Sequence, residues 1–193
     1  RGEDGRIRIA GVGVDVLRER FGTPLYVLDE DEVRARARRV RAAFEAATAR
    51  HGVHARVYYA GKAFLSTEVV RWVTEEGLAV DVATGGELAV ALAGGADPAR
   101  IGLHGNNKSV AELEQAVALG VGSIVIDSLT ELERLADIAT RLGLAGDGAQ
   151  NVLIRVNTGV HAETHDFLAT AHEDQKFGFA LADAPAVAAR VRA

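Results

Sequence analysis

A regular alternation between two kinds of segment constrains the fold of this chain more than any other feature of its sequence. Short apolar runs are followed by longer segments in which apolar residues recur every three or four positions. These runs are residues 56–60, 78–82, 100–104, 123–127 and 152–156, and they begin about 22 to 28 residues apart. Nearly continuous apolar character is typical of parallel strands that are covered on both faces. The repeat therefore predicts an α/β fold with a parallel sheet.

Two folds are built from such repeats, the (β/α)8 TIM-type barrel and the doubly wound sheet, and the strand ends favour the barrel. A polar residue lies at the carboxyl end of each run: Lys62, Asp81, His104, Asp127 and Arg155. Barrel enzymes place their chemistry at this end of the strands. No run is followed by the GxGxxG pattern of dinucleotide-binding sheets. Since a complete barrel needs about 250 residues, we expect an incomplete barrel with about five of its eight units.

One more strand and helix are expected before the repeat. The apolar run at 24–28 (PLYVL) predicts a strand. Asp29 or Asp31 is placed to cap the helix that follows, which should extend to about Thr48. We expect the partial barrel to comprise residues 21–193.

Composition narrows the class of protein further. The 193 residues have a net charge of −5, which argues against nucleic acid as a partner. No apolar run approaches the roughly 18–20 residues of a membrane span, and without Cys there is no disulfide framework or thiolate metal site. The charged, Gly-rich start does not resemble a secretory signal, so a soluble cytoplasmic protein is expected.

The sequence also predicts that this is the front part of a longer protein. It contains no Met, and it stops inside a helical pattern over residues 184–193. Residues 1–20 precede the barrel pattern and are expected to belong to a second domain that later sequence completes.

Lysine is rare in this chain, which uses 19 Arg but only Lys62, Lys108 and Lys176. Unlike Arg, Lys can lose its proton and form a Schiff base with a carbonyl group. Lys62 lies in YYAGKAF, just beyond an apolar strand, where burial beside apolar neighbours would favour the neutral amine. The alternative is an ordinary lysine whose charge reaches solvent.

Asp81 and Arg155 are charged residues inside otherwise apolar strands, so each needs a partner. Asp81 could pair with Lys62, with Arg155 or with a cofactor, and a structural ion pair is the competing interpretation. Gly85 and the glycine after it could admit a phosphate at a helix start, or could be ordinary turn residues. In HGNNKS, His104 and its polar neighbours could line a site or form a solvated loop.

Half of the six histidines lie in the polar stretch 158–175. His161 and His165 are four residues apart, which would suit zinc, but HExxH is absent and there is no Cys. A mobile active-site loop is the better interpretation, and no metal is expected.

Five segments together resemble the diaminopimelate decarboxylases, a family of barrel-type, alanine-racemase-like pyridoxal-phosphate enzymes. They are FGTPLYVLDED, YYAGKAF, LAVDVATGGELAVAL, LHGNNKS and LIRVNTGVHAETHDFLATAHEDQKFGF, and they occur in the order of the family, from about Phe21 to Leu181. The HGNNKS and HEDQKFGF motifs distinguish this family from the ornithine and arginine decarboxylases better than the Lys62 motif does.

The resemblance implies that Lys62 binds pyridoxal 5′-phosphate covalently and that Asp81 and Arg155 flank the cofactor ring. It places His104 with them as a cofactor-binding residue, and Lys108 and Lys176 on the active face. The phosphate-binding loop, the substrate-binding arginines and a C-terminal β-domain are then expected beyond Ala193.

The implied reaction is decarboxylation of meso-2,6-diaminopimelate to L-lysine, the last step of lysine biosynthesis, in a homodimer that acts on a small amino acid. The alternatives are another basic amino-acid decarboxylase of the same fold and a non-catalytic barrel that carries pyridoxal phosphate. A fragment of this length is expected to be inactive by itself.

Overall fold

A computed structural model describes residues 5–144, 146–158 and 177–192 of the chain, except for the side chain of residue 147. The chain divides into two compact units, Arg1–Val57 with Trp72–Leu78, and Tyr58–Arg71 with Ala79–Ala193. The expected boundary at residue 20 is therefore not where this division falls. The assignment of residues 1–20 to another domain stays a prediction.

The first unit begins with an antiparallel pair of short strands, β1 (Arg8–Ile9) and β2 (Val12–Gly13), and continues with helix α1 (Val14–Phe21). The strand predicted at residues 24–28 is wrong: this segment is irregular, and Tyr26 in it is 98% exposed. Apolar character alone does not make a strand, because a strand needs a neighbour for its backbone hydrogen bonds. Among the described residues the segment pairs with none.

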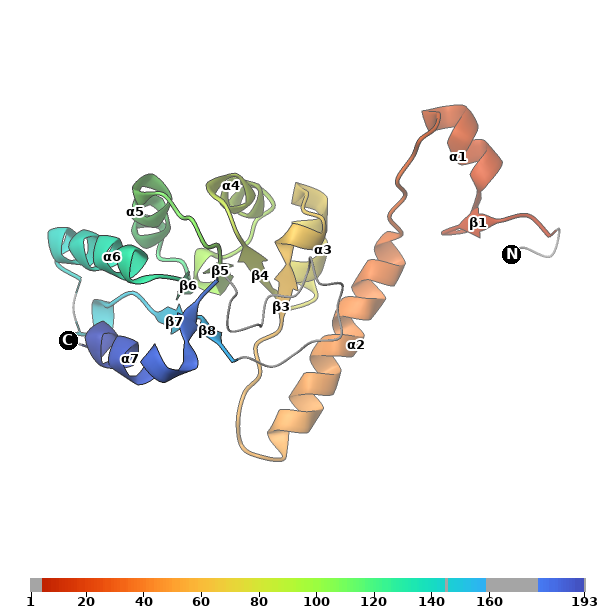
Figure 1. Ribbon diagram of the computed structural model, residues 1–193. Coiled ribbons are helices and arrows are strands. Elements are labelled where there is room, and N and C mark those ends of the chain that lie inside the picture. Colours follow the sequence, from red (N-terminus) through yellow and green to blue (C-terminus); the bar gives the residue numbers. More distant parts are fainter. Residues whose placement is uncertain (1–4, 145, 159–176, 193) are drawn as a thin grey trace. The chain divides into compact units, whose positions relative to one another are not determined.

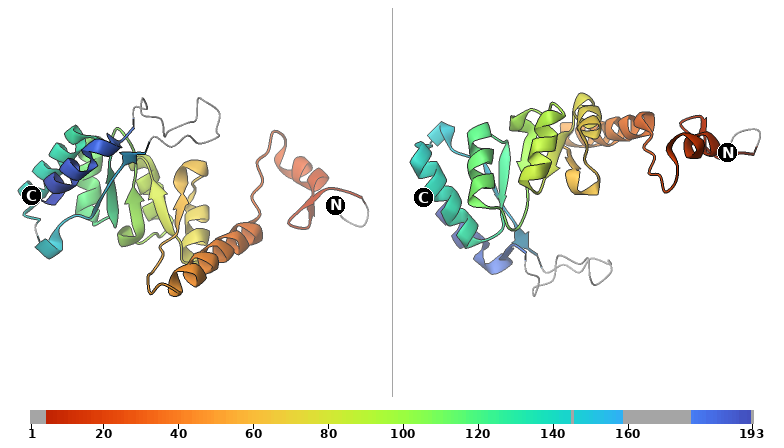
Figure 2. Two further views of the ribbon diagram at one scale, coloured as in Figure 1. Left: turned by 60° about the horizontal axis from the view of Figure 1, so that its bottom comes forward. Right: turned by 90° about the horizontal axis from the view of Figure 1, so that it is seen from above.

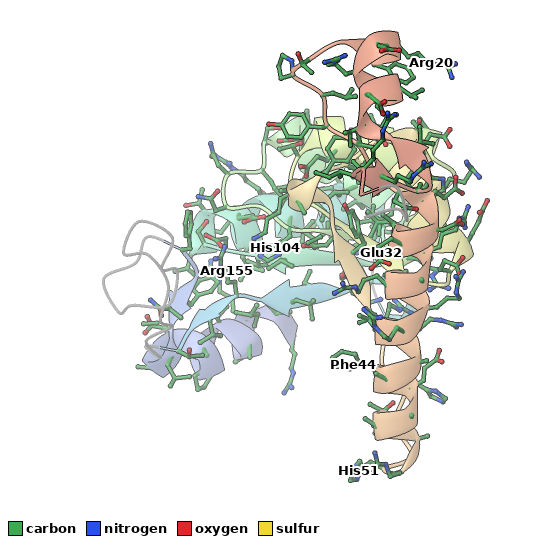
Figure 3. All side chains as sticks on the ribbon, turned by 90° about the vertical axis from the view of Figure 1, so that its right-hand side faces the viewer. Arg20, Glu32, Phe44, His51, His104 and Arg155 are labelled. Carbon is green, nitrogen blue, oxygen red and sulfur yellow. The ribbon has the colours of Figure 1, made fainter. Side chains whose placement is uncertain are left out.

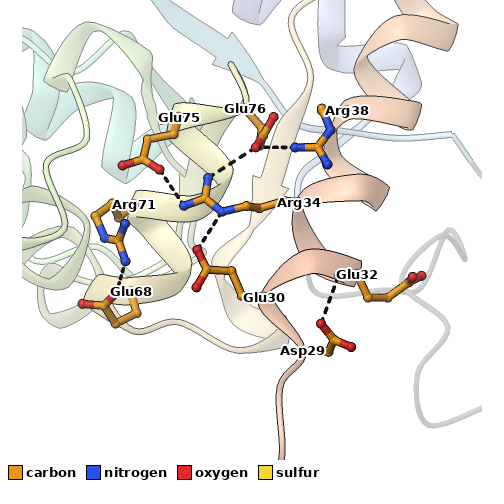
Figure 4. Close-up of polar contacts among 9 residues, drawn as sticks. All are labelled: Asp29, Glu30, Glu32, Arg34, Arg38, Glu68, Arg71, Glu75 and Glu76. Atoms are coloured by element: carbon orange, nitrogen blue, oxygen red, sulfur yellow. Dashed lines mark hydrogen bonds and ion pairs between the residues drawn. The ribbon is translucent and has the colours of Figure 1, made fainter. Parts of the chain in front are cut away.

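Helix α2 (Glu30–Ala49) begins as the sequence predicts, with the Asp29 carboxylate accepting a hydrogen bond from the Glu32 N–H at 3.3 Å. Within the same unit, α2 is joined to the end of helix α3 (Thr67–Glu75) by Arg34, which contacts Glu30, Glu75 and Glu76 (Figure 4). The hydrogen bonds to these carboxylates, that of Glu30 first, raise the pKa of the Arg34 guanidinium above its ordinary value.

The second unit is built on a five-stranded parallel sheet (Figure 1). The strands lie in the order β3-β4-β5-β6-β7, which is also their order in the sequence. Their bounds are β3 Tyr58–Ala60, β4 Ala79–Val82, β5 Ile101–Leu103, β6 Ser123–Ile126 and β7 Val152–Ile154. A doubly wound sheet would reverse its order midway, whereas a barrel does not. The predicted parallel sheet is confirmed, and the sequential order is that of a barrel.

Helices α4 (Gly85–Ala93), α5 (Val110–Leu119) and α6 (Leu129–Leu142) lie along one side of this sheet (Figures 1 and 2). The sheet residues on that side are aliphatic and at most 1% exposed: Val80, Val82, Ile101, Leu103, Ile124 and Ile126. Leu88, Leu113 and Ile138 are buried from the helix side. Burying each such side chain contributes about 1.5–3 kcal/mol, so this layer is the core of the unit.

A sixth parallel strand continues the pattern beyond the predicted five. After Ile154 the chain breaks its ladder at Arg155, and β8 (Val156–Asn157) then pairs in parallel with β9 (Phe179–Ala180). Helix α7 (Ala184–Arg192) follows β9. The sequence did not predict β9, because a strand of two residues is too short to show a pattern of apolar residues. The sheet is therefore an incomplete β/α barrel that has started its sixth unit.

Among the helices that the structure describes, none combines the length and the apolar character needed to cross a membrane.

Gly122 provides a test of how closely the units of the sheet are packed. A Cβ atom at this position would lie 2.2 Å from the Ala99 carbonyl oxygen, whereas one at Gly148 would have nothing within 4 Å. We expect Gly122→Ala to lower the stability of the complete protein by about 1–3 kcal/mol and Gly148→Ala to leave it nearly unchanged. Thermal unfolding of the two variants checks this, and equal midpoints would contradict the close contact.

Candidate active site

The carboxyl edge of the sheet carries polar side chains from all five strands. Asp81 lies near the end of β4, and Lys62, His104, Asp127 and Arg155 follow β3, β5, β6 and β7. The structure thus places these residues at one edge, as parallel strands in sequential order require. His104 and Arg155 are labelled in Figure 3.

Lys62 lies in a single 3-10 turn, Gly61–Ala63, that directly follows β3. A Cβ atom on Gly61 would be 2.8 Å from the Asp81 carbonyl oxygen, so the turn rests against the end of β4. The Tyr59 hydroxyl donates a hydrogen bond to the Phe64 carbonyl at 2.6 Å, and burial raises the pKa of that hydroxyl. Lys62 is exposed and has no hydrogen bond or ion pair with any residue that the structure describes. The turn therefore places Lys62 at the sheet edge with its side chain exposed.

Asp81 pairs with His104, and not with Lys62 or Arg155 as the sequence had suggested. His104 Nδ1 lies 3.4 Å from Asp81 Oδ2, and the two side chains are 39% and 30% exposed. The backbone N–H of His104 donates a hydrogen bond to the Val82 carbonyl at 2.6 Å, which extends the β4–β5 pairing as far as the site. Neighbouring strands thus present a carboxylate and an imidazole side by side.

The partner of Arg155 is Asp127, at the end of the adjacent strand. Arg155 Nη1 lies 3.2 Å from Asp127 Oδ1, and Asp127 Oδ2 accepts a hydrogen bond from the Gly178 N–H at 3.2 Å. The guanidinium also lies 4.9 Å from the centre of the Phe177 ring. The Asp127 side chain is only 4% exposed, so its charge depends on these partners. Sequence reasoning noted Asp127 at a strand end but did not make it a site residue, although its position on the neighbouring strand was a usable signal.

Of the other two candidate lysines, the structure describes Lys108 but not Lys176. Lys108 is buried, and its ammonium group contacts Glu131 and the carbonyl groups of Gly105 and Val125. It lies at the expected edge of the sheet but beneath the loop, not on the exposed face. Lys176, His161 and His165 lie outside the described residues. No group of side chains suited to a metal ion occurs in the described part of the chain.

The glycines at the start of α4 do not present a free phosphate site. The Gly85 N–H donates to Glu112 Oε1 at 2.7 Å, and the Glu87 N–H donates to the Thr84 hydroxyl at 3.1 Å. A carboxylate already occupies the position that an anion would take, and it would repel a phosphate. These glycines serve a turn and a contact between neighbouring units.

The inner face of the sheet is closely packed around its central strand, where Gly102 is buried. At the centre of this face stands Gly102, and a Cβ atom there would come within 3.3–3.5 Å of Tyr58, Asp81 and Ser123. A carbonyl cofactor needs an accessible amine and polar groups beside it. The exposed Lys62 amine and the Asp81, His104 and Arg155 side chains at the same edge of the sheet meet both requirements, so the residues present fit pyridoxal.

A barrel-type sheet with an exposed lysine after its first strand has the amine that a carbonyl-bearing cofactor needs. Residues 30–193 match the family model of the pyridoxal-binding domain of pyridoxal-dependent decarboxylases. The chain belongs to this family.

Relatives and solved structures agree with this assignment. The chain is 54% identical to diaminopimelate decarboxylase of Mycobacterium tuberculosis over 98% of its length. It resembles the diaminopimelate decarboxylase of M. jannaschii, solved with L-lysine, with a TM-score of 0.84 and 31% identity over 97% of this chain and 42% of that one. A lysine/ornithine decarboxylase from Vibrio vulnificus is less similar, with a TM-score of 0.57 and 26% identity over 72% of this chain and 38% of that one. The chain spans about 40% of the length of the curated relatives it matches.

Glu112 gives the site region a pH-dependent contribution to stability. Hydrogen bonds from the N–H groups of Ser109 and Gly85 lower the pKa of this carboxyl group. Because the folded-state pKa lies below the unfolded one, the contribution is present above the ordinary pKa of about 4.3 and is lost as pH falls through the folded-state value.

We expect Glu112→Gln to lower the urea midpoint of the complete protein at pH 7, and the difference from the parent to shrink as pH falls below about 4. Glu114→Gln on the same helix removes only an exposed contact with Arg141 and should have little effect at either pH. A Glu112→Gln deficit that stays constant with pH would contradict the role of the charge.

Proposed function

We propose that the complete protein decarboxylates meso-2,6-diaminopimelate to L-lysine and carbon dioxide, with pyridoxal 5′-phosphate attached to Lys62. The observation that carries the proposal is the 54% identity to diaminopimelate decarboxylases across 98% of the chain. A relative solved with L-lysine adds support, since L-lysine is the product of the proposed reaction.

Lys62, Asp81, His104 and Arg155 are the residues that would hold the cofactor from this part of the barrel. When bound, the conjugated ring of pyridoxal phosphate accepts the electron pair released as carbon dioxide leaves. Lys62 supplies the amine for attachment, and its position in the turn after β3 lets it return a proton to the reacting carbon.

The two polar pairs orient the remaining groups. The Asp81 carboxylate favours a proton on His104 Nδ1, which fixes the imidazole tautomer and leaves Nε2 free to face the cofactor. The Asp127 carboxylate orients the Arg155 guanidinium, whose other N–H groups can stabilise negative charge on the cofactor. We also propose that the complete protein is a cytoplasmic homodimer and that its substrate is a small amino acid.

The substrate is tested by measuring carbon dioxide release from the complete protein with meso-diaminopimelate, L-ornithine and L-arginine side by side. We expect turnover of diaminopimelate and at least a hundredfold lower kcat/KM for the other two. This ratio corresponds to about 2.7 kcal/mol of discrimination. Preference for ornithine or arginine would replace the proposal with another basic amino-acid decarboxylase, and binding of the cofactor without any turnover would indicate a carrier.

Attachment to Lys62 is tested by two substitutions in the complete protein. Lys62→Ala and Lys62→Arg should both abolish the visible absorbance band of lysine-bound pyridoxal phosphate and nearly all activity, since Arg keeps the charge but cannot attach to the carbonyl. Trapping with borohydride followed by peptide mapping checks the site directly. A label that remains bound to another lysine in Lys62→Arg would disprove the assignment.

A further inference from the structure

Among the described residues, the most completely buried ion pair joins Lys108 and Glu131, whose side chains are 1% and 5% exposed. Neither residue faces the exposed side of the cofactor site. Two charges this deep are costly to desolvate, and an apolar pair of similar volume would often be as stable. The pair therefore invites a role other than stability.

The Lys108 ammonium group lies among three oxygen atoms from different parts of the unit. It donates hydrogen bonds to the carbonyl groups of Gly105, in its own loop, and of Val125, in β6, the latter at 2.7 Å. Its third contact is the ion pair with Glu131 Oε1, an atom that accepts no hydrogen bond from the described residues. A compact ammonium group can lie close to three oxygen atoms at once, whereas the flat guanidinium of Arg would need more space. This explains a lysine in a chain that otherwise prefers arginine.

On one side, the pair holds the loop that carries His104. The loop is pressed against the end of β4, because a Cβ atom on Gly105 would lie 2.5 Å from the Ala83 carbonyl oxygen. The bond from Lys108 to the Gly105 carbonyl secures the same loop from the side of β6. His104, the residue before Gly105, then meets Asp81 at 3.4 Å.

On the other side, the pair holds Asp127. Glu131 Oε2 accepts a hydrogen bond from the Asp127 N–H at 3.1 Å, while Oε1 faces Lys108. Asp127 in turn contacts Arg155 at 3.2 Å. One buried pair is thus connected to both polar pairs of the site, through Gly105 to His104 and directly to Asp127.

We infer that Lys108 and Glu131 are positioning residues of the cofactor site, which set His104 and Arg155 in register with each other from beneath the sheet edge. The inference rests on the proposed function only in that His104 and Arg155 face pyridoxal phosphate. The substrate of the enzyme does not enter it.

The test measures the affinity of the complete apoprotein for pyridoxal phosphate by absorbance titration. The main variant is Lys108→Met/Glu131→Gln, which removes both charges together, avoids an uncompensated buried charge and keeps an acceptor for the Asp127 N–H. We expect a thermal midpoint close to that of the parent protein but cofactor affinity at least fivefold weaker. The control is Ile138→Ala, a buried residue of α6. It should lower the thermal midpoint and change the affinity for pyridoxal phosphate less than twofold.

Lys108→Arg keeps the positive charge but changes the shape of the cationic group. We expect this variant to fold and to show the same weakened affinity for pyridoxal phosphate. Unchanged affinity in both Lys108 variants would overturn the inference, as would an affinity loss in Ile138→Ala as large as theirs. Loss of folded protein in both would make the pair a folding requirement and would also overturn it. Failure of the diaminopimelate assay would leave the affinity measurement intact, so the two proposals fail separately.

Discussion

A carboxylate at the third position of a helix links strand to helix at three successive turns of this barrel, those after β4, β5 and β6. Helices α4, α5 and α6 are capped by Thr84, Ser109 and Ser128. In each, the glutamate three residues after the cap accepts a hydrogen bond from a backbone N–H just before its own helix. Each cap of this kind contributes about 1 kcal/mol. Two of these glutamates also reach the preceding unit, Glu112 at the Gly85 N–H and Glu131 at Lys108. These glutamates therefore link each strand to its helix and also link neighbouring β/α repeats to each other.

The two faces of the sheet differ in the side chains that they carry. The side of the sheet under the helices is filled by aliphatic residues with at most 1% exposure, while the inner side carries Asp81, Gly102 and Ser123. The same strands therefore supply a rigid hydrophobic layer and, one residue along, a polar inner face. The polar side chains of the inner face are held in place by the layer behind them, as the proposed cofactor site requires.

Much of the fold could be predicted from the sequence because its signals are local. The apolar period and the capping residues placed α6 at Leu129–Leu142 and the cap of α2 at Asp29 or Asp31, of which the structure shows Asp29. The failures are those in which a distant partner decides the outcome. Residues 24–28 look like a strand but have no neighbour among the described residues, and β9 is too short to give a period.

The residues of the site were predicted better than their partners. Strand-end position was enough to single out Asp81, His104 and Arg155, but not to show which side chains would meet. Side chains on adjacent strands pair, so the sequential strand order already favoured Asp127 as the partner of Arg155. The burial of Lys108 had no local signal, because the neighbours in HGNNKS are polar and the covering groups come from β6 and α6.

The double use of Asp127 has a consequence for how this protein can vary. One oxygen of its carboxylate contacts Arg155 and the other accepts the Gly178 N–H, so two points far apart in sequence are brought to the same buried group. The β8–β9 pairing, Asn157 opposite Ala180, repeats this closure next to it. A substitution at Asp127 would therefore disturb the position of Arg155 and the pairing of β8 with β9 together, so this position can vary only if both partners change with it.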